Sequence, residues 1–142
     1  MITHSEWQHD GVFQGIAENG NTLTFDAGDA HAEGPSPMEA VLMALCSCTS
    51  VDVVSILKKK RQALTGLRVT ASAERAETAP RVFTRIHLTY TVRGRLDRKA
   101  VEDAVALSKN KYCSVSQMLE KAAPVDYEIV FVDGEPGGET QP

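Results

Sequence analysis

The fold is decided by the stretch SPMEAVLMALCSCTSVDVVSILKKK, residues 36–60. Ser36 can serve as an N-cap, Pro37 suits the first helical position, and Glu39 falls where a carboxylate can bond back to the cap. These three residues predict a helix start, and the helix is expected to run over residues 37–60 and to end in a basic run. An apolar stripe at helical spacing follows the start, made of Met38, Val41, Leu42, Leu45, Thr49, Val53 and Ile56. The first turns are apolar nearly all round, so we expect them to be buried in the domain or against a second subunit.

Strand patterns flank this helix on both sides. Before it, residues 11–17 and 21–25 alternate around an Asn-Gly turn at 19–20, which predicts a hairpin. After it, residues 67–74 and 82–94 predict a half-buried antiparallel pair. The expected core face of the second strand consists of Val82, Ile86, Leu88, Tyr90 and Val92.

The remaining third of the chain predicts two helices and a strand. Asp97 is a candidate cap for a helix that places Leu107 inside and ends at Asn110. Ser114 and Gln117 form a capping-box pattern for a second short helix. Residues 125–132 alternate as a last strand. There are too few helices for a doubly wound parallel sheet, so we predict an α+β fold over a single domain, residues 1–133, and a flexible Gly- and Pro-rich tail at 134–142.

Composition and charge exclude several classes of protein. The chain has 142 residues, of which 42% are hydrophobic and 24% charged, as is usual for one globular domain. Residues 1–57 carry no Lys or Arg and a net charge of −8, residues 58–111 carry +9, and residues 112–142 carry −5. Aromatic residues do not alternate with the central basic residues, so we predict no nucleic-acid partner. The longest purely apolar stretch, residues 40–46, is too short for a membrane span, and the start resembles no signal peptide, so a cytoplasmic protein without a membrane partner is expected.

The three cysteines do not suggest a disulfide framework, because their number is odd and no export signal is visible. Cys46 and Cys48 form a Cys-x-Cys pair, but residues two apart on a helix point about 200° from each other, so only one thiol can face a given cavity. No His or second Cys pair lies at zinc spacing, and we predict no metal site. Cys113 lies at a predicted helix start near Lys109 and Lys111, a setting that favours a thiolate. The alternative is a buried cysteine that never reacts.

Two segments, SPMEAVLMALCSCTSVDVVSILKKK and NKYCSVSQML, together resemble the OsmC/Ohr family of thiol-dependent hydroperoxide reductases. The resemblance covers nearly the whole chain and looks closest to the YhfA-like branch of the family. In the family pattern, a helix that begins with Pro carries a Cys eleven residues later, which here gives Cys48 as the attacking, or peroxidatic, position. A Cys-x-Val-Ser helix start matches the resolving position, here Cys113. Cys46 is extra to the pattern and is interpreted as a packing residue.

The resemblance implies an OsmC-like fold with antiparallel sheets around a long central cysteine-bearing helix, and an intertwined homodimer with its sites at the subunit interface. It also implies an oxidative-stress role. The Cys48 thiolate attacks the peroxide O–O bond and becomes a sulfenic acid, and Cys113 condenses with it to a disulfide. A dithiol reductant then restores both thiols as co-substrate, and no other cofactor is expected. An apolar pocket would favour organic hydroperoxides over hydrogen peroxide.

Two departures from the family pattern keep a second function open. Peroxidatic members carry a Glu directly after the helix-starting Pro, where this chain has Met38. They also use an Arg from the N-terminal strands, whereas no Arg precedes Arg61 here. Supporting side chains could come from Glu39, or from Arg81 or Arg85 of a facing subunit.

The alternative function is therefore that of an OsmC-fold protein without useful turnover. Such a protein would bind a small apolar ligand, or would sense oxidants through slow formation of a Cys48–Cys113 disulfide. The loss of an Arg–Glu pair would remove the main electrostatic reason for a low thiol pKa at the attacking position.

Overall fold

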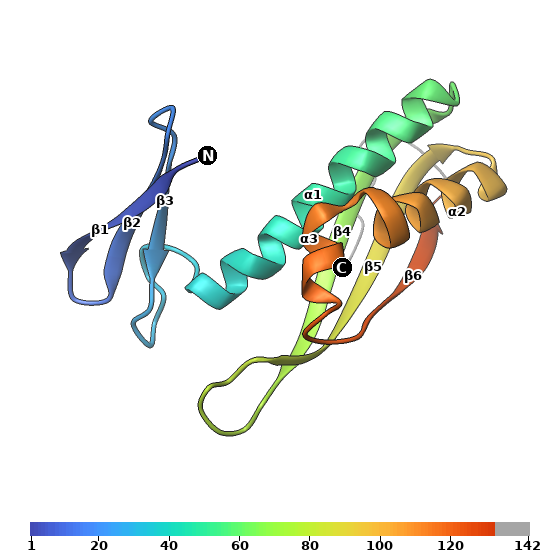
Figure 1. Ribbon diagram of the computed structural model, residues 1–142. Coiled ribbons are helices and arrows are strands. Elements are labelled where there is room, and N and C mark those ends of the chain that lie inside the picture. The colour runs from blue at the N-terminus through green and yellow to red at the C-terminus, as the bar shows by residue number, and fades with distance from the viewer. Residues whose placement is uncertain (133–142) are drawn as a thin grey trace. The chain divides into compact units, whose positions relative to one another are not determined.

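The structure is a computed structural model that describes residues 1–132. The predicted tail at 134–142 lies outside the described residues. The chain forms two compact units, one from Met1 to Met43 and one that begins at Ala44. Figure 1 shows the elements of each unit. The long helix α1, Pro37–Lys59, contributes residues to both units, and it starts and ends within one residue of the sequence-based prediction.

The first unit is a three-stranded antiparallel sheet with the order β1-β2-β3. Its strands are β1, Thr3–His9, β2, Val12–Ala17, and β3, Thr22–Asp26. The β2–β3 hairpin pairs Ile16 with Thr22 and turns through Gly20, whose φ of 91° is readily adopted only by glycine. The predicted hairpin is confirmed. Within residues 1–43, only Val12 and Asp26 are buried, so this unit has almost no core of its own.

The start of α1 is a capping box, as predicted. The Ser36 amide donates to Glu39 Oε1 at 3.0 Å, and the Glu39 amide donates to Ser36 Oγ at 3.1 Å. These hydrogen bonds lower the pKa of Glu39, because they stabilise its charged form. Lys58 and Lys59 lie in the last turn, where positive charge is favourable to the helix dipole.

The second unit contains a three-stranded sheet with the order β4-β5-β6. The antiparallel pair of β4, Ala63–Arg75, and β5, Phe83–Arg95, confirms the prediction. However, β6, Val125–Val132, pairs with β5 in parallel, so the expectation of purely antiparallel sheets is wrong for this unit. The physical reason is the connection: the chain crosses from β5 to β6 through helices, and such a crossover allows parallel pairing where a tight turn does not.

Three short helices make that crossover: α2, Arg98–Leu107, then η1, Ser108–Tyr112, then α3, Ser114–Leu119. Asp97 caps α2 by accepting from the Ala100 amide, as predicted. The other two expectations are wrong. Asn110 does not end a helix, because the chain continues as the π-helix η1, and Leu107 at the junction is 37% exposed.

The core of the second unit lies between one face of the sheet and the helices, which Figure 1 shows on the same side of the sheet. Ile86, Leu88, Tyr90 and Val92 are buried on β5 as predicted, but Val82 is 52% exposed and Phe83 takes its place. A register shift between Glu74 and Arg75 of β4 accounts for the difference, since a bulge changes which residue faces inward. The fully buried core residues of the helices are Leu45, Thr49, Val53, Leu57, Val101, Ala104, Val105, Ser108, Cys113 and Ser116.

Candidate functional site

Cys48 and Cys113 are neighbours in the second unit, although 65 residues separate them in the sequence. Cys48 lies in the middle of α1 and is partly exposed, whereas Cys113 lies between η1 and α3 and is fully buried. The two side chains lie close enough for Cys48 to act on the Cys113 thiol, and Cys48 favours the protonated form of Cys113.

The surroundings of Cys113 oppose a thiolate, contrary to the sequence-based expectation. Burial is the main cause and raises the pKa of Cys113 to about 11, and the contact with Cys48 and the nearby charge of Asp52 act in the same direction. The Ser116 amide donates to Cys113 Sγ at 3.4 Å and acts the other way, but it does not outweigh desolvation. Lys109 does not supply the expected positive charge to the thiol, since its ammonium group is paired with Glu120.

The same contact shows that Cys113, and not Ser114, caps α3. Its backbone is extended, with φ −72° and ψ 105°, and its sulfur accepts from the amide three residues later. The predicted cap was therefore misplaced by one residue, because cysteine is not among the residues usually preferred at this position. The cap fixes the Cys113 sulfur at the end of a π-helix, a type of helix that is rare and occurs frequently at functional sites.

A buried chain of hydroxyl groups lies next to the two cysteines. Thr49 Oγ1 is 2.7 Å from the hydroxyl of Tyr90 and 2.7 Å from Ser108 Oγ. Ser108 Oγ donates to Asp52 Oδ2 at 2.8 Å, so the chain ends on a carboxylate. Burial raises the pKa of Tyr90 to about 12, with Cys113 among the smaller contributors, so Tyr90 remains a neutral hydroxyl at the edge of the site.

The sequence pattern does not mark these residues as part of a site. It places Thr49 within the apolar stripe of the long helix and Tyr90 on the apolar face of a strand. Hydroxyl groups at predicted core positions could have indicated this buried polar network, because a buried hydroxyl needs a hydrogen-bond partner. Asp52 also lies four residues after Cys48, the spacing that places two helical side chains on the same face.

Cys46 has different neighbours from Cys48, as the spacing of two residues on a helix predicts. Desolvation raises the pKa of Cys46, and the nearby backbone of Ala71 on β4 acts in the opposite direction. Its thiol is thus directed to the sheet, which agrees with the interpretation as a packing residue.

The three candidate supporting residues all have other partners within the chain. Glu39 belongs to the capping box described above. Arg81 Nε donates to the backbone of Ala76, in the loop between β4 and β5. Arg85 Nη2 donates to Asp126 at 3.0 Å on the exposed face of the sheet, where His87 also bonds to Asp126. Within one chain, the structure brings Cys48 and Cys113 together without any of these three side chains.

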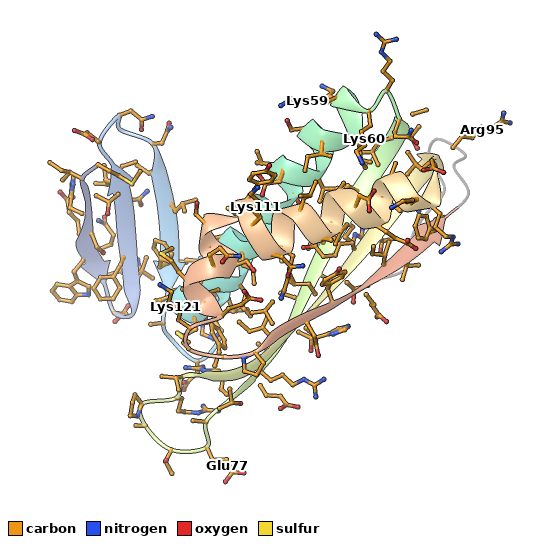
Figure 2. The ribbon with its side chains drawn as sticks, turned by 45° about the vertical axis from the view of Figure 1, so that its right-hand side comes forward. Lys59, Lys60, Glu77, Arg95, Lys111 and Lys121 are labelled. Carbon is orange, nitrogen blue, oxygen red and sulfur yellow. The ribbon has the colours of Figure 1, made fainter. Side chains whose placement is uncertain are left out.

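Other kinds of site have little support in residues 1–132. No group of three or more His, Cys, Asp or Glu side chains in this range is placed to hold a metal ion. Basic side chains are distributed along the second unit, as Figure 2 shows for Lys59, Lys60 and Arg95 near one end of α1 and for Lys121 beyond α3. By length and composition, α1 is also apolar enough to span a membrane, and 22% of its most apolar window is buried in the protein. Its buried residues are Leu45, Thr49, Val53 and Leu57.

The OsmC-like protein family profile matches residues 28–128, a range that includes both cysteines. This chain belongs to the OsmC-like protein family. It is 46% identical over 133 residues to Protein YhfA of Escherichia coli K12, covering 92% of this chain and 98% of that protein. The resemblance inferred from the two cysteine motifs, including the YhfA-like branch, is therefore confirmed.

Solved structures extend the comparison to the fold. A protein from Aquifex aeolicus VF5 is 31% identical and superposes with a TM-score of 0.79 over 92% of this chain and 96% of its own. An organic hydroperoxide resistance protein OsmC from Legionella pneumophila superposes with a TM-score of 0.68 at 14% identity, over 92% of this chain and 97% of its own. At that identity the likeness concerns the fold alone, which is the α+β OsmC-like fold with two small sheets and a long helix.

Proposed function

We propose that this protein is a thiol-dependent reductase of organic hydroperoxides that uses Cys48 and Cys113 as its redox pair. The observation that carries the proposal is the proximity of these two side chains, since Cys48 acts on the pKa of Cys113 although the thiols come from distant parts of the sequence. Membership in the OsmC-like family supports it, and so does the fold shared with an organic hydroperoxide resistance protein. The difference in exposure also fits the two roles, because the attacking cysteine must meet the peroxide and the resolving cysteine need not.

The proposed cycle has three balanced steps. The Cys48 thiolate attacks the O–O bond of ROOH, which breaks; the sulfur is oxidised to a sulfenic acid and, with one proton, ROH leaves. Cys113 then attacks the Cys48 sulfur, a disulfide forms, and its thiol proton leaves with the hydroxide as water. An external dithiol finally reduces the disulfide by exchange, becomes a disulfide itself and returns both cysteines to thiols.

The direct test is a steady-state assay with an alkyl hydroperoxide and a dithiol. We expect turnover in the wild type, a loss of about 100-fold or more in Cys48→Ser, and loss of the multiple-turnover phase in Cys113→Ser. Cys46→Ser is the matched control and should retain the wild-type rate. It removes a thiol from the same helix, but this thiol is directed to the sheet and not to Cys113. Absence of turnover in the wild type, or a wild-type rate in Cys48→Ser, would contradict the proposal.

The second candidate function is redox sensing or small-ligand binding without useful turnover. It is favoured by Met38 in place of the family Glu and by the absence of Lys and Arg from residues 1–57. Intact mass measured after one equivalent of hydroperoxide separates the cases. A disulfide that forms slowly, with no catalytic turnover, indicates a sensor, and no disulfide leaves ligand binding.

We further propose that the protein works as a homodimer. The first unit presents an apolar groove of about 650 Å³ on its sheet, lined by residues of β1, β2 and β3 such as Ile16, Leu23 and Phe25. Leu23 is 67% exposed, and Met43 on the first part of α1 is 53% exposed. A second copy of the chain would cover such surface. Analytical ultracentrifugation should give twice the chain mass, and Met43→Glu should reduce the dimer fraction.

A further inference from the structure

Ser108 connects the two elements that carry the cysteines. Its hydroxyl donates to Asp52 Oδ2 at 2.8 Å, and it lies 2.7 Å from Thr49 Oγ1 and 3.3 Å from the Thr49 carbonyl oxygen. All these partners lie on α1, and Thr49 is the residue directly after Cys48. The side chain of Ser108, the first residue of η1, is therefore bound to the part of α1 that carries Cys48.

The backbone of Ser108 holds Cys113. The Ser108 carbonyl accepts from the Cys113 amide at 2.8 Å, five residues later, which is the hydrogen bond of a π-helix. In an α-helix that amide would bond four residues back, to the carbonyl of Lys109. The Lys109 carbonyl instead accepts from two side chains of α3, Ser116 Oγ at 3.1 Å and Gln117 Nε2 at 3.2 Å. The wider turn therefore binds Cys113 to Ser108 on one side and holds α3 on the other.

This connection from α1 to Cys113 is shielded from water, because Ser108, Thr49 and Cys113 are all fully buried. A displacement of η1 along α1 would leave the hydroxyls of Ser108 and Thr49 without partners in the core, which is costly since no water is there to replace them. The hydrogen bonds of Ser108 thus fix where Cys113 lies along the helix that carries Cys48.

We propose that Ser108 is the positioning residue of the cysteine pair: with its hydroxyl bound to α1 and its carbonyl bound to the Cys113 amide, it holds the Cys113 thiol within reach of Cys48. The inference rests on the proposed function and concerns its second step, in which Cys113 attacks the oxidised sulfur of Cys48. A disulfide forms only over a narrow range of separations and orientations. Holding one thiol in place therefore raises its effective concentration at the other.

The test measures that effective concentration in the full-length protein without peroxide. The Cys46→Ser background leaves Cys48 and Cys113 as the only thiols, and the protein is equilibrated in buffers of reduced and oxidised glutathione. Each protein disulfide that forms reduces one glutathione disulfide to two thiols, and intact mass after alkylation gives the oxidised fraction. In Ser108→Ala we expect the effective concentration to fall about tenfold, which makes the reduction potential of the pair less negative by about 30 mV.

The matched control is Val101→Ala, which removes buried methyl groups from the core of α2 and leaves the hydrogen bonds of Ser108 in place. It destabilises the reduced and the oxidised protein alike, so the effective concentration should stay within about twofold of the wild-type value. A purely structural role of Ser108 would give the same result in Ser108→Ala.

A second variant tests the same connection from α1. Thr49→Val removes one partner of the Ser108 hydroxyl and leaves Asp52, so we expect a smaller fall, of about threefold. If Ser108→Ala does not fold, as judged by circular dichroism, Thr49→Val decides by itself: a fall supports the inference and a wild-type value overturns it. The inference is also overturned if Ser108→Ala keeps the wild-type value, or if Val101→Ala lowers it equally.

The outcome is independent of turnover, because no peroxide is used. A tenfold fall in Ser108→Ala of a protein without reductase activity would refute the proposed function alone. An unchanged effective concentration in an active protein would refute this inference alone.

Discussion

The two sheets of this protein have three strands each but differ in what covers them. In the sheet of the second unit, Ile86, Leu88 and Tyr90 are completely buried beneath helices. In the sheet of the first unit, every residue of β1 is exposed, and Leu23 on β3 is 67% exposed. A three-stranded sheet usually needs an apolar face packed against something to be stable in water.

The comparison shows that well-formed strand pairing and the stability of the folded chain have different origins in this protein. The first unit has a well-formed hairpin, a strong helix cap and good strand register, but almost no buried apolar surface. Among residues 1–132, all the buried apolar residues except Val12 lie in the second unit. Because burial is the main favourable term in folding, the second unit is expected to hold nearly all the stability of a single chain.

The largest expected effect on the free energy of unfolding comes from replacing one leucine in each sheet by alanine. Leu88→Ala removes a fully buried side chain and should lower the free energy of unfolding by about 2–5 kcal/mol. Leu23→Ala removes an exposed one and should change it by less than about 0.5 kcal/mol in the single chain. Chemical denaturation at low protein concentration measures both. A large loss for Leu23→Ala that grows with protein concentration would instead mean that a second copy covers this sheet.

The next largest effect concerns buried hydroxyl groups. Thr49→Val leaves the hydroxyls of Tyr90 and Ser108 without a shared partner in the core, and should cost about 1–3 kcal/mol. The matched change in the first unit is Thr24→Val. The Thr24 hydroxyl donates to the Gln14 side chain at 3.4 Å in a partly exposed position. It should cost less than about 0.5 kcal/mol. Equal losses in thermal unfolding would show that the first unit is buried as well as the second.

A smaller effect is expected at the helix caps. Ser36→Ala removes a capping hydroxyl whose partner is the Glu39 amide, and should cost about 1 kcal/mol. Ser114→Ala removes the hydroxyl that sequence pattern alone would select for α3, and should be nearly neutral because Cys113 is the cap. The denaturant midpoints of the two variants measure these losses of stability. A loss at Ser114 equal to that at Ser36 would contradict the sulfur cap.

The smallest effect is a pH dependence from exposed histidines. Asp126 raises the pKa of His87, chiefly by a hydrogen bond, so the folded state holds this proton more tightly than the unfolded chain. The resulting stabilisation is complete below the ordinary value of 6.5 and is lost as the pH rises through the raised pKa. His87→Gln should therefore lower the melting temperature slightly in acid and leave it unchanged in alkaline buffer.

In the first unit, His9→Gln is the counterpart, since Asp10 raises the pKa of His9 in the same way. His9→Gln should change the melting temperature with the same dependence on pH as His87→Gln. The change should be smaller if the first unit contributes little stability. A melting temperature that falls more in alkaline than in acidic buffer would contradict the assignment for either residue.

Much of the fold follows from local chemistry, and those parts were predictable. The helix start at Ser36 and the hairpin turn at Gly20 depend on residues within a few positions of each other. The misplaced features depend on distant contacts. Val82 was expected inside and is exposed, because a bulge set by the pairing of β4 with β5 shifts the inward-facing position to Phe83. Nothing in the alternation of β5 itself reveals that bulge.

The site was predictable in part for the same reason. The family motifs predict Cys48 and Cys113 as the working pair, and the structure places these two side chains close together. The ionisation of Cys113 was predicted in the wrong direction, since position at a helix start suggests a thiolate whereas burial, which no local pattern encodes, dominates. Asp52 and Ser108 lie 56 residues apart and are joined only by the folded structure.

The sulfur of Cys113 is both the cap of α3 and the atom that would enter a disulfide. Oxidation therefore cannot change this thiol without also changing the hydrogen bond that holds the Ser116 amide. A disulfide fixes the direction of the Cys113 sulfur, so the first turn of α3 should loosen when the pair is oxidised. The rate of hydrogen exchange at the Ser116 amide would then report the redox state of the pair, with no label on either cysteine.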